Sequence, residues 1–267
     1  MLAILAAALV VAFFVAVPTL AANGSSGDFG DEGRLRDAFH PAFVEYWSSG
    51  ERDLAPGLAT VVDYWFRYHV VKAVIAAILL VVLITLGVLL WKAFLRIDGR
   101  GMRRRGALAS AVLVTALGLL SLVTVMANIQ GVVTPFASLL PMLTTGTTDG
   151  ELANTLDQLR RQLAESLNAG GRTAPALDVM ISDFARYHAA MAVIAATVAV
   201  VFIVASMVLW WKFARTDSAD RRTRRVLGSF DILTVLSTLG LIVVAVVNTS
   251  TAADPGPALL ALFEGGW

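Results

Sequence analysis

The stretches FRYHVVKAVIAA (66–77) and FARYHAAMAVIAA (184–196) each place Arg-Tyr-His just before a long apolar run. Aligning the chain with itself at an offset of 119 residues superimposes the two triplets. Other matching pairs are Pro56 and Pro175, Trp91 and Trp210, and, after one inserted residue, Lys92 and Lys212, Asn128 and Asn248, and Pro135 and Pro255. Because matches in this order exceed what a shared apolar composition produces, we predict an internal duplication.

Five apolar stretches along the chain are each about 20 residues long, the length of helix that crosses roughly 30 Å of hydrocarbon. The composition agrees, since 57% of the residues are apolar and 15% are charged. We therefore expect an all-α integral membrane protein with about five transmembrane helices in a tandem parallel repeat, in which spans 2 and 3 resemble spans 4 and 5. The expected spans are residues 2–22, 70–95, 107–127, 189–211 and 226–247.

Charge is distributed unevenly among the loops. Two short loops, 92–105 and 212–225, hold 12 of the 21 lysines and arginines. The long segment 23–66 has eight acidic residues and three arginines, and the long segment 129–185 has six and three. Because basic short loops stay in the cytoplasm, we expect a cytoplasmic N-terminus. The membrane is expected to be the bacterial plasma (inner) membrane. The long acidic loops and the C-terminus would then lie outside.

These patterns divide the chain into six expected segments. They are a first span or signal-like segment (1–22), an outer loop with an amphipathic helix (23–66), repeat 1 with two spans and a basic inner loop (67–135), an outer helical loop (136–185), repeat 2 of the same build (186–260) and an outer tail (261–267). Apolar residues at helical spacing predict one unbroken helix from about 57 to 96. A leucine stripe predicts a second outer helix over 151–168, with Leu152, Leu156, Leu159, Leu163 and Leu167 on one face.

The first apolar stretch has two readings. It carries no Lys or Arg before its apolar run, which is unusual for a signal peptide, but Thr19-Leu20-Ala21 offers a small-x-small step. The duplication gives this stretch a counterpart in span 3, which favours a retained transmembrane helix.

The two histidines of the repeated triplets, His69 and His188, form the first candidate site. One interpretation is an interface belt, in which Tyr rings lie at headgroup depth and Arg reaches lipid phosphate. The other is a pair of imidazole ligands for haem or a metal ion, because imidazole ligates haem iron and many transition metals. Both alternatives stay open, and the identity of any cofactor is unknown. The residues expected to anchor the interface are Arg67, Arg186, Trp91 and Trp210.

A polar ring near the outer boundary is the second candidate site. Lys72 lies one helical turn beyond His69, where a cation must reach the headgroups or find a partner. The candidate pocket comprises Tyr68, Lys72, Asn128, Tyr187 and Asn248.

Several chemistries lack their sequence signals. The chain has no cysteine, which excludes disulfides, thiol catalysis and cysteine-ligated metal sites. It has no phosphate-binding glycine loop, no His-Glu-x-x-His and no nucleophile elbow, and we identify no catalytic residue. The span interiors are almost free of ionisable groups, which argues against an ion-coupled transporter. The basic loops are short and lack aromatic interleaving, so we do not expect nucleic acid as a partner.

Three functions remain. The first is a non-enzymatic accessory or scaffold subunit of a membrane complex, whose partners are the lipid bilayer and either another protein or further copies of the chain. The second is a haem- or metal-binding redox protein that uses His69 and His188. The third is a small-molecule or lipid transporter with the polar ring as its vestibule.

The segments HPAFVEYW (40–47), DYWFRYHVVKA (63–73) and ARYH (185–188) carry a resemblance to uncharacterised, duplicated actinobacterial membrane proteins. Some members of that group are labelled as carrying Tat signals. This chain differs from the label, because no twin-arginine motif precedes its first apolar run. The resemblance implies no activity.

Overall fold

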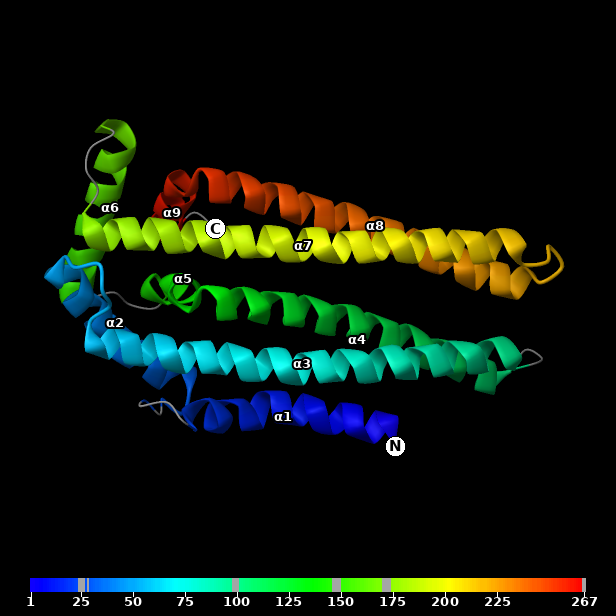
Figure 1. Cartoon of the computed structure of the whole chain (residues 1–267). Coiled ribbons are helices and arrows are strands. Elements are labelled where there is room, and N and C mark those ends of the chain that lie inside the picture. Colours follow the sequence, from blue (N-terminus) through cyan, green and yellow to red (C-terminus); the bar gives the residue numbers. More distant parts are fainter. Residues whose placement is uncertain (24–26, 28, 98–100, 146–149, 170–173, 266–267) are drawn as a thin grey trace. The chain divides into compact units, whose positions relative to one another are not determined.

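Helices form every regular element that the computed structural model describes, which covers residues 1–23, 27, 29–97, 101–145, 150–169 and 174–265. In chain order they are α1 (Leu2–Ala22), α2 (Glu32–Ser49), α3 (Pro56–Arg96), α4 (Met102–Val133), α5 (Pro135–Leu139), the 3₁₀ helix η1 (Leu140–Leu143), α6 (Glu151–Ala169), α7 (Pro175–Arg215), α8 (Arg221–Ala253) and α9 (Pro255–Glu264) (Figure 1).

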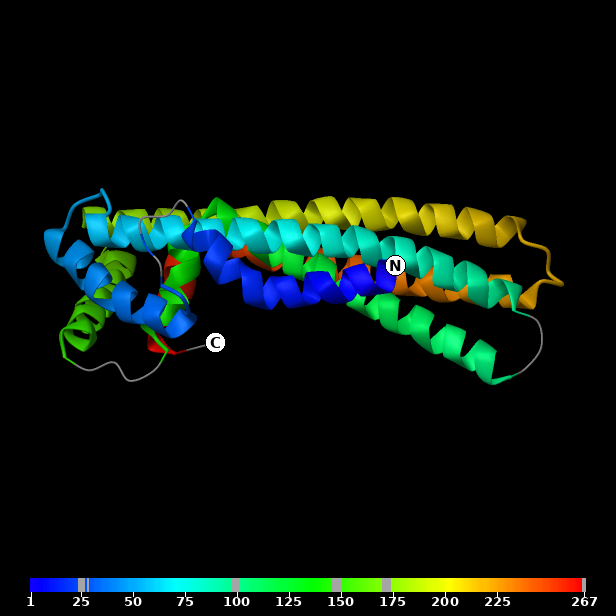
Figure 2. The ribbon, with the colours of Figure 1, turned by 90° about the horizontal axis from the view of Figure 1, so that it is seen from below.

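Proline marks the start of four helices. Helices α3, α5, α7 and α9 each begin at one, where the missing N–H costs nothing and the fixed φ suits the first turn. Helices α3 and α7 each continue for 41 residues without a break, as both ribbon views show (Figures 1 and 2). At 1.5 Å per residue each is about 60 Å long. The single helix expected from about 57 to 96 is therefore confirmed.

Five helices, α1, α3, α4, α7 and α8, are long and apolar enough to cross a membrane. The five long apolar helices expected from the sequence are thus confirmed for the described residues. Every regular element in the described part of the chain is helical, and its long apolar helices are those of a membrane protein.

The chain divides into two compact units. Unit 1 comprises residues 1–11, 75–126 and 191–248. Within it, Ala6 of α1 packs with Val82 and Leu83 of α3 and Val114 of α4. Many of its large apolar side chains are exposed, among them Val81, Val112, Val193 and Val243. In water such a surface would be unfavourable, but in a bilayer it faces acyl chains.

Unit 2 comprises residues 12–74, 127–190 and 249–267. Its apolar side chains form a buried cluster to which α1, α2, α3, α5, η1, α6, α7 and α9 contribute. The fully buried side chains include Phe39, Phe43, Tyr46, Leu159 and Phe263. Unit 2 therefore has an interior of the kind found in water-soluble domains.

Helix α2 shows how local sequence builds unit 2. Asp31 caps its N-terminus by accepting a hydrogen bond from the backbone N–H of Arg34 at 2.9 Å. Gly50 ends it with φ +66°, a conformation that costs other residues about 1–2 kcal/mol. Between these caps, Tyr46 donates to the carbonyl of Ala176 at 3.4 Å. Burial raises the pKa of Tyr46 to about 12, so its hydroxyl stays protonated at neutral pH.

Helix α6 confirms the helix expected over 151–168. Four of its five stripe leucines, Leu152, Leu156, Leu159 and Leu163, are buried in the core of unit 2. The fifth, Leu167, is 42% exposed, so the stripe faces the core over about three turns and leaves it at the last leucine.

Candidate functional site

His69 lies on α3, and its ring is oriented by a hydrogen bond. Its Nδ1 lies 3.0 Å from Oδ1 of Asn128 on α4. Because a carboxamide oxygen only accepts, Nδ1 carries the proton and Nε2 carries a lone pair. The Nε2 atom is buried and has no hydrogen-bond partner among the residues that the structure describes. Ligating histidines also have their second ring nitrogen held by an oxygen acceptor, but the ligand role of His69 stays a prediction.

Because Gly131 has no side chain, the ring of His69 can lie against the backbone of α4 at this position. A Cβ atom at position 131 would lie 2.6 Å from both Cδ2 and Nε2 of the ring, closer than such atoms approach. The indole of Trp65 meets the same ring edge to face, with centroids 4.7 Å apart. The imidazole is thus held by a hydrogen bond, a close backbone and an aromatic ring.

His188, in the corresponding triplet, has aromatic neighbours on its own helix. Its ring meets that of Phe184 at 4.6 Å and that of Tyr187 at 5.5 Å between centroids. The use of His69 and His188 as two ligands of one group stays a prediction.

The polar-ring residues on α3 lie together. The Nζ of Lys72 is 4.4 Å from the centroid of the Tyr68 ring, one turn away, and 5.1 Å from that of Phe13 on α1. Tyr68 stacks on Trp65 with centroids 4.9 Å apart and planes 8° apart. These π faces provide favourable contacts for the ammonium group at this depth. Tyr68 also lines a small hollow of about 30 Å³ with Pro18 and Tyr64.

The other members of the predicted ring make backbone contacts. The carbonyl of Tyr187 accepts a hydrogen bond from Nε2 of Gln130 at 3.0 Å. Nδ2 of Asn248 donates to the carbonyl of Val244, one turn earlier on α8, at 2.9 Å. The structure therefore unites His69 with Asn128, and Tyr68 with Lys72. A single pocket containing all five ring residues stays a prediction.

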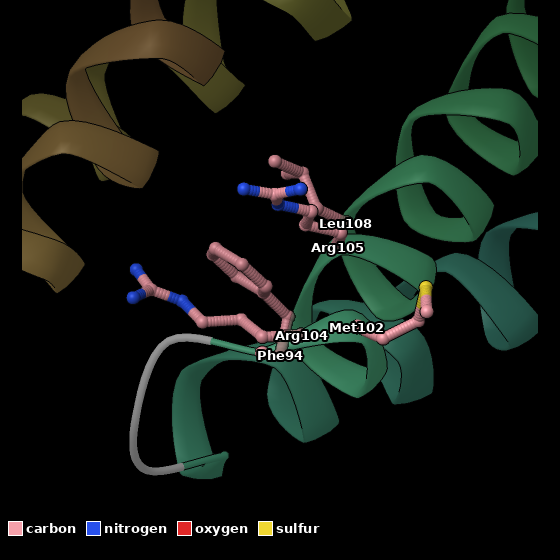
Figure 3. A pocket seen from close by; sticks show the side chains of 6 residues that line it. Phe94, Met102, Arg104, Arg105 and Leu108 are labelled. Atoms are coloured by element: carbon pink, nitrogen blue, oxygen red, sulfur yellow. The ribbon is translucent and has the colours of Figure 1, made fainter.

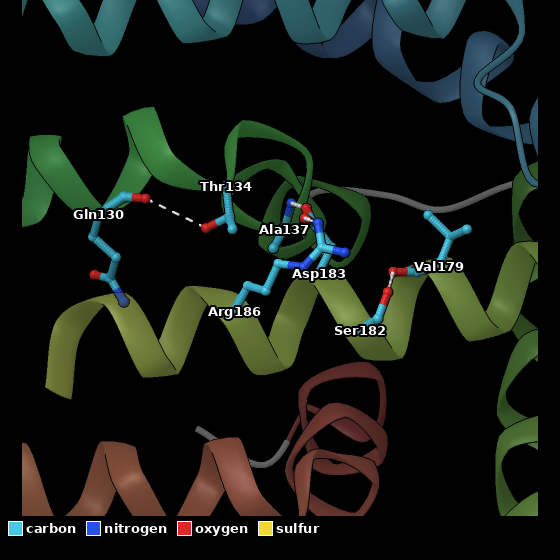
Figure 4. Close-up of polar contacts among 7 residues, drawn as sticks. All are labelled: Gln130, Thr134, Ala137, Val179, Ser182, Asp183 and Arg186. Atoms are coloured by element: carbon cyan, nitrogen blue, oxygen red, sulfur yellow. Dashed lines mark hydrogen bonds and ion pairs between the residues drawn. The ribbon is translucent and has the colours of Figure 1, made fainter. Parts of the chain in front are cut away.

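A polar network around α5 was missed by the sequence reasoning (Figure 4). The hydroxyl of Thr134, at the N-cap position of α5, donates to the carbonyl of Gln130 at 3.3 Å and does not cap the helix. Asp183 of α7 supplies the cap, because its carboxylate accepts from the N–H of Ala137 at 3.0 Å. Arg186 lies 3.9 Å from the same carboxylate. The only sequence signal was an acidic residue three positions before Arg186.

The expected interface anchors differ in their surroundings. Arg67 pairs with Asp63 on its own helix at 2.9 Å. The indole N–H of Trp91 donates to Thr115 of α4 at 3.1 Å, whereas Trp210 is 63% exposed. The role of these residues at a lipid interface stays a prediction.

The third histidine, His40, has a local contact. Its Nε2 lies 3.2 Å from the carbonyl of Met142, which ties α2 to η1. Among the described residues, no group of three or more His, Asp or Glu side chains could hold a metal ion. No protein-family model, curated protein or solved structure matches the chain.

Proposed function

We propose that the protein is a non-enzymatic accessory or scaffold subunit of a membrane complex, and that unit 2 is the part that meets its partner. The observation that carries this proposal is the core of unit 2. An apolar core to which eight helices contribute supports a stable surface, whereas a chain that only anchors itself in lipid needs no such domain.

The exposed side of α6 is the best candidate for the docking face. Its buried leucines fix the helix against the core, so that Gln158, Gln162 and Glu165 lie on the opposite side and are exposed. These positions follow a four- and three-residue spacing, which gives one continuous polar face. On the proposed topology this face lies outside the cell, in the acidic segment 129–185.

The experiment that tests this role is purification from the native membrane in mild detergent. A subunit is expected to bring one partner with it at fixed stoichiometry. The triple variant Q158K/Q162K/E165K should lose that partner, because it adds four positive charges to the proposed face.

A matched control carries the same change in charge elsewhere. The variant D217K/S218K/A219K also adds four positive charges, in the exposed loop between α7 and α8. It is expected to retain the partner. A wild-type protein that purifies alone, or two variants that behave alike, would count against the proposed docking role.

We propose as the second candidate a haem- or metal-binding redox protein that uses His69, with His188 as the further ligand. The observation in favour is the buried lone pair on Nε2 of His69, with Nδ1 held by Asn128. Because Nε2 also lies against Gly131, a ligand at this atom requires the ring or α4 to shift. Absorption spectra of the oxidised and dithionite-reduced protein test this function. A Soret band that disappears in His69→Ala would support it, and a colourless, metal-free protein would exclude it.

We also propose that the internal duplication expected from the sequence extends to the helix pairs of the structure. Helices α3 and α7 start at aligned prolines and have equal lengths, and α4 and α8 have 32 and 33 residues. We propose that the two helix pairs are parallel repeats with their basic loops in the cytoplasm.

A further inference from the structure

Unit 1 contains an apolar cavity of about 480 Å³ between α3, α4, α7 and α8. Its volume falls within the range of about 300–1,000 Å³ that is usual for ligand sites. Along α3 the lining extends from Leu80 to Leu95, which is about 22 Å at 1.5 Å per residue. One leaflet of hydrocarbon is about 15 Å thick, half of a 30 Å core. The cavity is therefore long enough for the acyl chain of one lipid.

Three polar side chains in the wall of the cavity, those of Trp91, Thr115 and Thr234, are already bonded to the protein. The indole of Trp91 donates to Thr115, whose own hydroxyl donates to the carbonyl of Ala111 at 2.8 Å. The hydroxyl of Thr234 donates to the carbonyl of Asp231 at 2.8 Å. A polar ligand would find few free partners here, whereas an alkyl chain needs none. The wall thus favours hydrocarbon.

One end of the cavity is basic. Lys92 lines it and is exposed, and among the described residues no carboxylate lies within ion-pair distance of its ammonium group. Next to it, the guanidinium of Arg222 donates to the carbonyls of Leu95 and Ile97 at 3.0 and 2.8 Å. The carbonyls of Leu95 and Ile97, at the C-terminal end of α3, therefore already have Arg222 as a hydrogen-bond donor. Lys92 is available for an anion.

A second hollow, of about 440 Å³, lies at the adjacent turn of α3 (Figure 3). It is lined by Phe94, whose ring meets that of Trp91 edge to face with centroids 5.7 Å apart. Figure 3 shows Arg104 and Arg105 extending on the same side of α4 as Phe94, and the guanidinium of Arg104 is 5.4 Å from the centre of that ring. Two further cations thus lie beyond the basic end of the cavity.

We propose that unit 1 binds one anionic phospholipid. Its acyl chain lies in the cavity between the four helices, and its phosphate meets Lys92, with Arg104 and Arg105 as the next cations. Basic pockets between transmembrane helices are a known way of holding anionic headgroups. On the proposed topology this end of the cavity faces the cytoplasmic leaflet. The proposal does not depend on the scaffold role of unit 2.

Trp91 provides the readout, because it lines the cavity. The delipidated protein is titrated, in mild detergent, with phosphatidylglycerol brominated on its acyl chains, and bromine quenches nearby indoles. The contribution of Trp91 is the difference between the fluorescence quenching of the wild type and that of Trp91→Phe. Brominated phosphatidylglycerol is expected to quench Trp91 at a concentration at least about fivefold lower than the concentration of brominated phosphatidylcholine that gives the same quenching.

Two pairs of variants separate the acyl site from the headgroup site. Gly118 lines the cavity, and a Cβ added there meets nothing within 4 Å, so Gly118→Phe should fill the space and abolish quenching. Gly240 of α8 has equally open space, is not part of the lining and provides the control Gly240→Phe.

Lys92→Gln should weaken phosphatidylglycerol binding about fivefold, and its counterpart Lys212→Gln should leave it unchanged.

Each result decides the proposal. Selective quenching by phosphatidylglycerol that is lost in Gly118→Phe and weakened in Lys92→Gln supports it. Equal quenching by both lipids overturns the headgroup assignment, and unchanged quenching in Gly118→Phe overturns the acyl site. If Gly118→Phe fails to fold, the Lys92→Gln and Lys212→Gln comparison still decides whether an anionic lipid is recognised.

Discussion

The two Arg-Tyr-His triplets, 67–69 in α3 and 186–188 in α7, have the same sequence but different neighbours. His69 contacts Asn128 and Gly131 on α4 and the Trp65 ring on its own helix, whereas at the position that corresponds to Trp65 the ring of His188 meets Phe184. Identical triplets fix where the side chains lie on a helix. Their contacts depend on the residues packed around them, and these differ between the two halves.

The largest expected effect concerns Gly131. The substitution Gly131→Ala places a Cβ 2.6 Å from the His69 ring, which must move. Overpacking of this kind costs about 1–3 kcal/mol, and we expect the free energy of unfolding to fall by about 2 kcal/mol. Reversible unfolding by SDS, titrated in mixed micelles, measures it.

The control for that variant is Gly240→Ala, where an added Cβ meets nothing within 4 Å. Alanine favours helix over glycine by about 1 kcal/mol, so this change should be neutral or stabilising. In the His69→Ala background, Gly131→Ala should cost almost nothing, because the ring that the added Cβ would displace is absent. Equal effects at positions 131 and 240 would mean that the His69 ring is not held as described.

The second effect compares the acidic partners of the two arginines. The side chain of Asp183 is 17% exposed and accepts from the N–H of Ala137, whereas that of Asp63 is 44% exposed and pairs only along its helix. Hydrogen bonds to charged groups contribute about 1.5–3 kcal/mol, and exposed ion pairs about 0–1 kcal/mol. Asp183→Ala should therefore reduce the free energy of unfolding by about 1.5 kcal/mol and Asp63→Ala by less than about 0.5 kcal/mol.

The same SDS titration applied to both variants tests this difference. If Asp63→Ala is as destabilising as Asp183→Ala, the cap on α5 contributes nothing beyond an ordinary ion pair.

The third effect concerns the tautomer of His69. Asn128→Ala removes the acceptor of Nδ1–H and should cost about 1 kcal/mol, the usual net value of one hydrogen bond. In a double-mutant cycle with His69→Ala, the two changes should be non-additive by a similar amount.

Nitrogen-15 NMR of labelled histidine provides the direct measurement. The wild type is expected to show His69 protonated at Nδ1, and Asn128→Ala should lose this preference. A wild-type signal for the Nε2-protonated form would contradict the assigned hydrogen bond and the lone pair on Nε2.

Much of the fold could be predicted from the sequence, because helices and spans depend on local periodicity. The starts of α3 and α7 follow from Pro56 and Pro175, and the leucine stripe located α6. The departure of Leu167 from the core could not be predicted, because a stripe does not reveal where the opposing surface ends.

The candidate site could be predicted only in part, since it depends on contacts between helices. His69 and Asn128 were both identified, although 59 positions separate them. Gly131 and Asp183 were not, because a glycine in a helix and an acid beside an arginine are common patterns. Gly131 matters because the ring of His69 lies against it, and Asp183 matters because the N–H of Ala137 donates to it. Both contacts depend on how the helices pack.

The smallest expected effect tests a charge difference between the triplet regions, Lys72 in α3 and Met191 in α7. The substitution Lys72→Met removes a cation–π contact with Tyr68 that is worth about 0.5–1 kcal/mol. A methionine sulfur also packs favourably on aromatic rings, by about 0.3–1.5 kcal/mol, and should offset most of this loss. We therefore expect the SDS titration to show a change below about 0.5 kcal/mol. A loss above about 1.5 kcal/mol would instead mean that the ammonium group has a further anionic partner, which would favour the polar-ring site over a lysine that only rests on aromatic faces.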